Sequence, residues 1–482
     1  MISFTESQVQ ALVTDVGTLK RGQQLAAPTN WSNLGRTDYA LWGECAGSGK
    51  TPYQIGIDLH GPAYHCNCPS RVFPCKHAAG LLLLQARQPT LLAPGPVPAW
   101  LAGWLSKRQA SAPAAASTPP AGGAAPAGAP AAPAAGKPAK ATKAPSAKSL
   151  ASQQREAERL ARMDQGAAEF ETWLLDLVRE GLAGKEKQPA SYWAQPAARL
   201  VDNQLPGLAA WVRAAAPPAK KVPADWAETL LGRLGEVYGL LRAFRNRASL
   251  PAEAQAEVQQ QVGLYLTREE LLADQPTVAD TWLVLGQYSA KEDKLNARYT
   301  WLQGQQTGRY ALVQEYAVRS KAYHAPLAPK TSYVGGLAFY PGLLPLRAVL
   351  APDFTFAPEP SAGTELPTPA GGTIGELYDG YAQALGRNRW LRAWPGALAD
   401  VVLARRTGGE WVLRHESLPN ELLPLYQDGE ALNVIWEVLA LGGGVPFTAF
   451  GEWDGTAYRM LEGWVPAEDE PADTYAPAAA EA

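Results

Sequence analysis

Two short runs of metal-binding residue types stand close together early in the chain, Cys66-Asn-Cys68 and Cys75-Lys-His77. Zinc prefers thiolate sulfur and imidazole nitrogen, and a closed set of four such ligands makes a tetrahedral structural site. Residues i and i+2 of a strand point to the same side, so Cys66 and Cys68 can hold one ion from a strand end. The pattern predicts one Zn²⁺ bound by these four residues. The alternative, four ordinary buried or free side chains, leaves their crowding unexplained.

The flanking sequence predicts the elements that position these ligands. Residues 53–59 alternate apolar and polar side chains, which is typical of a half-buried strand, and a second strand should lead into Cys66. Pro74 suits the first turn of a helix, which should run from Cys75 to about Ala86. The helix dipole would favour thiolate charge at its start. Other elements are expected as a helix at 5–13, irregular sequence to residue 35, a strand at 38–42 and a helix at 99–107.

The spacing Cys-x-Cys, a gap, then Cys-x-His resembles the SWIM zinc finger, and all four ligand positions are filled. The resemblance extends through Trp42-Gly-Glu-Cys45, Pro52-Tyr53 and the apolar run Leu81–Leu84. The chain is similar to bacterial SWIM zinc finger family proteins. Related modules occur in Mutator-class transposases, Swi/Snf-class ATPases and ubiquitin-pathway proteins, which implies binding of DNA or protein and no catalysis. Family members are often encoded near MoxR-type ATPases and von Willebrand A-domain proteins, which implies a role in a protein complex.

Three residues beside the ligands are candidate partner contacts. Arg71 and Lys76 could meet phosphates, and Phe73 could insert or stack on a base, although packing of Phe73 beneath the zinc loop is favoured over a contact role. Cys45 is either a small buried side chain or a further ligand near the ion.

No catalytic arrangement is found elsewhere in the sequence. Gly43–Thr51 looks like a phosphate-binding loop, but Glu44 stands where its first glycine is required, and a strand rather than a helix follows. His324 and His415 are single histidines of structural or surface type. We therefore expect a protein that is not an enzyme, with an unrecognised C-terminal active site as an alternative.

Composition divides the 482 residues into segments. Residues 109–148 are nearly all Ala, Pro, Gly and Ser with four lysines, which is typical of a disordered tether. The predicted order is a SWIM-type zinc finger domain at 1–108 with its ββα core at about 53–87, the linker at 109–148, a helical region at 149–275, an α+β region rich in hairpins at 276–466, and a disordered acidic tail at 467–482. The fold class is α+β multidomain.

The spacing of apolar residues predicts helices in residues 149–275, and turn signals predict hairpins in residues 276–466. Apolar residues recur at helical spacing from Leu160 to Leu177, and further helices are expected near 192–214, 225–244, 251–264 and from Thr267. Beyond residue 279, hairpins are expected at 297–318, 401–415 and 447–461. The last of these turns at Asp454-Gly455. Helices are expected at 375–385 and 430–441.

The distribution of charge and of cysteines limits the kinds of partner and the cellular compartment to be expected. Residues 1–108 carry nine Lys/Arg against five Asp/Glu, and the linker adds four lysines. Because the whole chain has a net charge of −3, residues 149–482 must have a net charge of −11. This asymmetry permits binding of nucleic acid or an acidic partner by the N-terminal part. All four cysteines lie between Cys45 and Cys75, which argues against a disulfide framework and for a reducing cytoplasmic setting. No apolar run is long enough to span a membrane, and the N-terminus lacks signal-peptide features.

These observations favour a zinc-binding, non-catalytic interaction protein whose finger binds protein or nucleic acid, as an adaptor in a bacterial complex. The alternative to a protein partner is sequence-tolerant DNA binding, which would weaken steeply with salt.

Overall fold

The computed structural model describes residues 4, 6–13, 16–47, 51–59, 63–70, 74–111, 150–216, 225–292, 295–317, 323, 327–357, 368–418, 420–442 and 444–466. The fold is α+β, as the sequence predicts, with three sheets among these residues. The expected linker and tail lie outside them, except for residues 109–111, which are helical. No helix of the described part is both long and apolar enough to cross a membrane.

The chain forms two compact units, one of residues 1–112 with 266–482 and one of residues 113–265. The metal-ligand region therefore shares a unit with the C-terminal region instead of standing alone at the end of a tether. Among the described residues, short 3-10 turns occur at Pro28–Asn30, Pro89–Leu91, Lys185–Lys187 and Arg247–Ser249.

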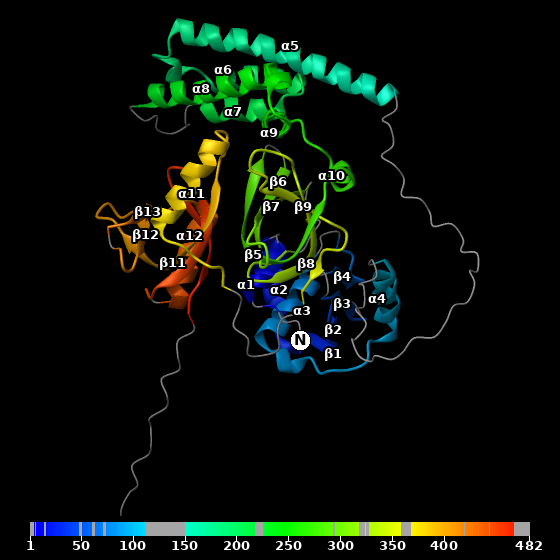
Figure 1. Ribbon diagram of the computed structural model, residues 1–482. Coiled ribbons are helices and arrows are strands. Elements are labelled where there is room, and N and C mark those ends of the chain that lie inside the picture. Colours follow the sequence, from blue (N-terminus) through cyan, green and yellow to red (C-terminus); the bar gives the residue numbers. More distant parts are fainter. Residues whose placement is uncertain are drawn as a thin grey trace, which may run out of the picture. The chain divides into compact units, whose positions relative to one another are not determined.

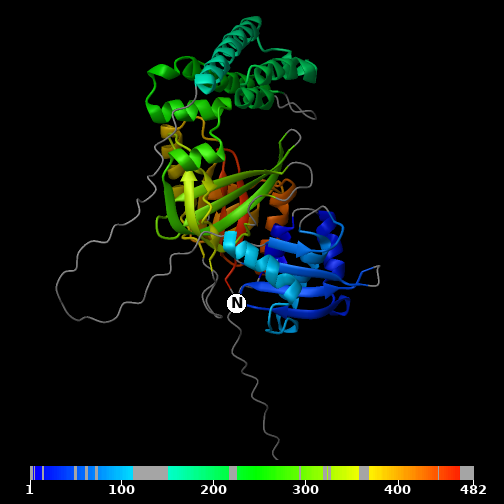
Figure 2. The same cartoon turned by 90° about the vertical axis from the view of Figure 1, so that its right-hand side faces the viewer.

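The N-terminal part of the first unit is a four-stranded antiparallel sheet in the order β1 (Trp31–Arg36), β2 (Ala40–Cys45), β3 (Tyr53–Asp58) and β4 (Ala63–Cys66). Helices α1 (Glu6–Leu12), α2 (Val16–Leu25) and α3 (Lys76–Arg87) belong to one core with Leu41, Ile55 and Ile57 of this sheet. Helix α4 (Ala99–Ser111) packs on the opposite face through Leu101 and Leu105 (Figure 2).

The expected hairpin β3–β4 and the helix after it are confirmed, but the irregular stretch expected up to residue 35 is wrong. Helix α2 escaped detection because it contains glycines, which disfavour helices. Gly22 is needed there, since a Cβ on it would lie 2.7 Å from the Cβ of Ala79 in α3. Strand β1 lacks regular alternation because its register shifts between Ser32 and Gly35.

The second sheet closes on itself. Strands β5 (Thr277–Glu292), β6 (Leu295–Gly304) and β7 (Tyr310–Ala317) form an antiparallel meander (Figure 1). Strand β8 (Ser332–Phe339) pairs with β5 and also with β9 (Arg347–Leu350), which runs parallel to β7. These five strands make a barrel, and β10 (Thr355–Phe356) extends the free edge of β8. Helix α10 (Arg268–Asp274), expected from Thr267 and begun there by a capping box, packs on the outside of the barrel.

The third sheet has the order β13 (Leu422–Pro424), β12 (Trp411–His415), β11 (Trp394–Arg405), β14 (Phe447–Trp453) and β15 (Tyr458–Trp464). Helices α11 (Ile374–Arg387) and α12 (Gly429–Gly442) pack on one face of it through Leu377 and Ile435. The other face packs against the barrel. The hairpins β6–β7, β11–β12 and β14–β15 and both helices agree with the sequence.

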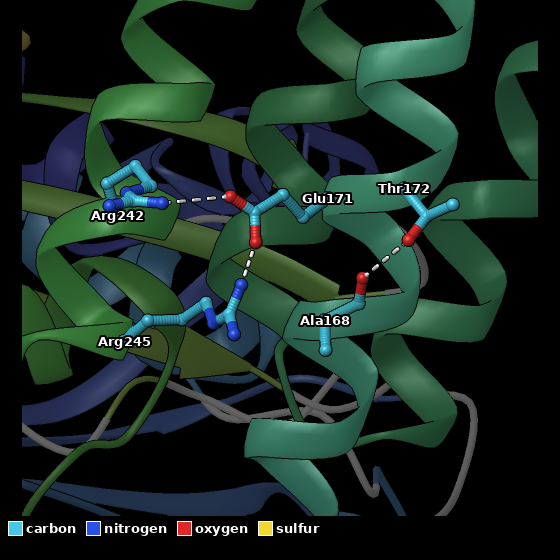
Figure 3. Close-up of polar contacts among 5 residues, drawn as sticks. All are labelled: Ala168, Glu171, Thr172, Arg242 and Arg245. Carbon is cyan, nitrogen blue, oxygen red and sulfur yellow. Dashed lines mark hydrogen bonds and ion pairs between the residues drawn. The ribbon is translucent and has the colours of Figure 1, made fainter.

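The second unit is a helical bundle of α5 (Leu150–Glu180), α6 (Ala190–Asp202), α7 (Pro206–Ala215), α8 (Trp226–Arg245) and α9 (Ala252–Val262) (Figure 1). The predicted apolar stripe of α5 is buried from Met163 to Leu177. Polar contacts join α5 to α8 as well. Glu171 of α5 accepts hydrogen bonds from Arg242 and Arg245 of α8 (Figure 3). Within α5, Thr172 donates to the carbonyl of Ala168 one turn earlier.

Candidate metal centre

The structure brings together all four ligands that the sequence predicts. Cys66 ends β4, Cys68 follows two residues later, Cys75 caps the start of α3 and His77 lies in its first turn. The three sulfur atoms and one ring nitrogen of these residues all lie within 4.8 Å of one another. His77 presents Nδ1 to the cluster, 3.8 Å from Cys66 Sγ and 4.0 Å from Cys75 Sγ.

The donor set fits a structural metal site. Three sulfurs and one imidazole nitrogen are ligands that zinc prefers, and a group of four fills a tetrahedral shell. Cys75 and His77 are buried, whereas Cys66 and Cys68 are half-buried, so the site lies at the edge of the core. The cluster can hold one metal ion that ties the end of β4 to the start of α3.

The protonation of the cysteines differs with their surroundings. The pKa of Cys75 is lowered to about 4, chiefly because the Cys66 thiol hydrogen-bonds to it, with help from His77 and from the N–H groups that begin α3. The pKa of Cys66 is raised, first by its hydrogen bond with Cys75 and then by burial. Burial also raises the pKa of Cys68. Helix α3 thus favours a thiolate at Cys75, the position closest to its positive end.

Neighbouring residues hold the ligands in place. The ring of Tyr53, in β3, lies 4.6 Å from the imidazole of His77, centroid to centroid. The chain between the two cysteines of the first pair is tied to β3, because Asn67 Oδ1 accepts from the Gln54 N–H at 2.9 Å. Such contacts around a ligand fix its orientation before an ion binds.

Cys45 does not join the four-ligand cluster. It is fully buried on β2, and its thiol lies 3.6 Å from the carbonyl oxygen of Ala46. Burial raises the pKa of this thiol to about 11. Of the two readings that the sequence left open for Cys45, a small buried side chain is the one that the structure favours.

The candidate partner contacts are only partly described. Lys76 is the first residue of α3 and is exposed beside the ligands. Arg71, Phe73 and His324 lie outside the described residues. His415, which the sequence assigned a structural or surface role, accepts the Ser417 N–H through Nδ1 at 3.2 Å.

Sequence reasoning missed two features near aromatic residues. His65 of β4 lies against Trp100 and Trp104 of α4, at 6.1 and 5.5 Å between ring centroids. Glu452 of β14 is a buried carboxyl group whose pKa is raised to about 7 by burial. Its place as the one charged residue in the run Phe447–Trp453 was the signal that could have found it.

Comparison with known proteins adds one finding. Residues 158–262 match the family model of the SWIM-associated four-helix bundle domain, which covers α5 to α9 and not the ligand cluster itself. Neither the curated proteins nor the solved structures contain a significant match to the chain. The matched bundle and the cluster of Cys66, Cys68, Cys75 and His77 together fit a SWIM-type zinc finger.

Proposed function

We propose that this protein is a zinc-dependent, non-catalytic interaction protein that acts as an adaptor in a cytoplasmic protein complex. The observation that carries the proposal is the closed ligand set of the metal centre. Four protein ligands leave no coordination position for water or substrate, so the ion would stabilise structure instead of activating a nucleophile. A reducing compartment suits the proposal because it keeps the three thiol ligands reduced.

Exposed apolar side chains at α12 favour a protein partner. Ala431, Ile435 and Val438 of this helix are buried against the third sheet. Trp436 and Leu441 are 51% and 70% exposed, and Val445, just past the helix, is 47% exposed. Trp436 is the strongest candidate contact among them, because a tryptophan is a frequent centre of binding energy in protein interfaces. By family resemblance, MoxR-type ATPases and von Willebrand A-domain proteins are the first partners to test.

Crosslinking in cells, followed by reconstitution with the purified partner, tests the proposal. Trp436→Glu with Leu441→Glu should abolish the complex while zinc content stays unchanged. Leu231→Glu is the matched control, because Leu231 is 53% exposed on α8 of the other unit. Equal binding by both variants and the parent protein would move the interface away from α12, and the absence of any reconstituted complex would refute the adaptor role.

The same preparation tests the DNA-binding alternative. Labelled duplex and single-stranded DNA would be titrated at several salt concentrations, with Arg71→Ala/Lys76→Ala beside the parent protein. Of these two residues, only Lys76 belongs to the described part of the chain, and its side chain is exposed. Binding that weakens with salt and with the double substitution would replace the adaptor proposal.

A further inference from the structure

The strand order of the barrel is that of a fold whose outer face often binds ligands. Taken as strands one to five, β5 to β9 close in the order one-two-three-five-four-one, with only strands three and five parallel. This is the order of the oligonucleotide- and oligosaccharide-binding (OB) barrel, whose ligands lie on the outer face of its second and third strands. A fold alone does not assign a function, so the ligand of this face has to be inferred from its side chains.

The third sheet covers one half of this outer face. Along β6 and β7, side chains alternate between the two faces, and Leu302 and Val313 belong to the inner core. Trp301 and Leu312 point outward and pack with Phe450 of β14. No ligand can reach this half while the two sheets remain packed together.

The other half carries a row of tyrosines, which we call the tyrosine strip: Tyr288, Tyr299, Gln314 and Tyr316. Tyr288 and Tyr299 are cross-strand partners, and their rings stack at 4.8 Å with planes 7° apart. Gln314 pairs with Tyr299 on the next strand and donates through Nε2 to Tyr299 OH at 2.9 Å and to Tyr316 OH at 2.6 Å. Tyr316 is 44% exposed and the other three are half-buried, so the strip lies at the surface.

The third sheet extends the strip with a cation. The guanidinium of Arg459 lies 4.4 Å from the ring centroid of Tyr426 and 5.6 Å from that of Tyr288. Asp428 accepts from Arg459 at 3.2 Å, and Tyr426 donates its hydroxyl proton to Asp454. Each of these side chains is therefore held by a partner within the protein. A surface ordered before binding loses little side-chain entropy when a ligand arrives.

The charge around the tyrosine strip is unsuited to a polyanion. The exposed or half-buried carboxyl groups beside its residues outnumber the cations: Asp428, Glu430 and Asp454 stand against Arg459 and against Lys291, three residues along from Tyr288. Residues 149–482 as a whole carry a net charge of −11. A nucleic acid would meet repulsion here, because its affinity comes largely from cations on phosphates.

We propose that the tyrosine strip with Arg459 is a binding site for an uncharged oligosaccharide. Tyrosine rings offer flat apolar faces to the C–H faces of sugar rings and carry a polar tip. The Gln314 amide, the Arg459 guanidinium and the Asp428 carboxylate supply donors and acceptors for sugar hydroxyl groups. This site shares no residue with the metal centre or with the exposed Trp436 and Leu441 of α12, so the proposal does not depend on the adaptor function.

Titration of the zinc-loaded full-length protein with uncharged hexasaccharides tests the proposal. The probes are the hexamers of cellulose, starch and chitin, observed by saturation-transfer NMR and calorimetry. At least one should bind with an affinity that salt does not change. Tyr316→Ala should weaken that binding about tenfold, because it removes the most exposed aromatic face of the strip. Tyr316→Phe keeps the ring and should retain most of the affinity.

Controls separate this site from other surfaces. Tyr378→Ala removes an exposed tyrosine on α11 and should leave binding unchanged. The proposal is overturned if no hexasaccharide binds at millimolar concentration, or if Tyr316→Ala and Gln314→Ala bind like the parent protein. Tight, salt-sensitive binding of a thymidine oligonucleotide that Tyr316→Ala abolishes would assign the strip to single-stranded nucleic acid instead.

Discussion

Phe4, near the N-terminus, lies edge-on against Phe356 of β10, with ring centroids 5.9 Å apart. The same Phe4 donates its N–H to Gln85 Oε1 of α3 at 3.4 Å, and Gln8 donates to the Pro329 carbonyl at 3.3 Å. Helix α3, which bears His77, thereby shares one hydrophobic core with the barrel. Residues 1–112 therefore form one compact unit with residues 266–482. Helix α3 buries residues from His77 through Gln85 without a break, more than one small sheet can cover.

Loss of the metal ion should therefore unfold the barrel as well as the finger. Apparent zinc-binding free energies of structural sites, about 10–16 kcal/mol in zinc-finger peptides, exceed or match the whole stability of a domain, about 5–15 kcal/mol. In Cys66→Ser and His77→Ala we expect β5 to β9 to lose amide protection in hydrogen exchange. Residues 158–262 should keep theirs, because they form a separate unit.

The control for this experiment is Lys76→Ala, which changes an exposed residue between two ligands and should leave protection intact. Full protection of the barrel in the two ligand variants would contradict a shared core and restore the picture of a tethered module.

Metal content should distinguish the four ligands from Cys45. Elemental analysis of the purified protein should give about one zinc ion per chain. Serine at position 66, 68 or 75, or alanine at position 77, should bring the content near zero. Cys45→Ser should retain the ion, because Cys45 lies outside the cluster. A loss of zinc in Cys45→Ser equal to that in Cys66→Ser would instead make Cys45 a ligand.

The sequence predicted the parts of the fold whose signals are local. The four ligands lie close together in the chain, and the two-residue turn at Asp454-Gly455 directly predicts the hairpin β14–β15. Closure of the barrel left no such signal, because β7 and β9 pair in parallel across more than thirty intervening residues, Leu312 with Arg347. Packing of α3 against the barrel was equally hidden, since a run of apolar residues shows that a helix is buried but not by what.

An ion pair that joins α5 to α8 should stabilise the bundle. Glu171 is only 8% exposed and lies between Arg242 and Arg245. Removing one partner of a buried pair leaves an uncompensated group, but both arginines are partly exposed, so Glu171→Ala should cost about 1–3 kcal/mol. Urea unfolding followed by hydrogen exchange in residues 158–262 would measure the loss.

The matched control on the same helix is Asp176→Ala, whose pair with Arg179 is exposed on both sides. Exposed pairs contribute about 0–1 kcal/mol, so this variant should unfold close to the parent protein. Equal effects of the two substitutions would mean that the Glu171 contacts contribute no more than a surface pair.

Glu452 should make the packing between the barrel and the third sheet sensitive to pH. Burial raises its pKa from 4.5 to about 7 in the folded protein, against the lowering influence of Tyr288 and Arg459. Between these two pKa values the folded state holds a proton that the unfolded state has released. The free energy of unfolding should therefore fall as pH rises from about 4.5 to about 7, by about 3 kcal/mol from this group. Glu452→Gln cannot ionise and should remove that part of the slope.

The measurement is the difference in unfolding free energy between the parent protein and Glu452→Gln at matched pH values. Tryptophan fluorescence reports the unfolding. The two proteins should be most alike near pH 4.5 and should diverge toward pH 7, where the parent protein must bury a charged carboxylate or protonate it. Tyr288→Phe is a useful second variant, because it removes a hydroxyl group whose hydrogen bond favours the ionised form and should push the pKa of Glu452 higher still. A difference that stays constant from pH 4.5 to pH 7 would show that Glu452 titrates normally and that the two sheets are not coupled to pH through it.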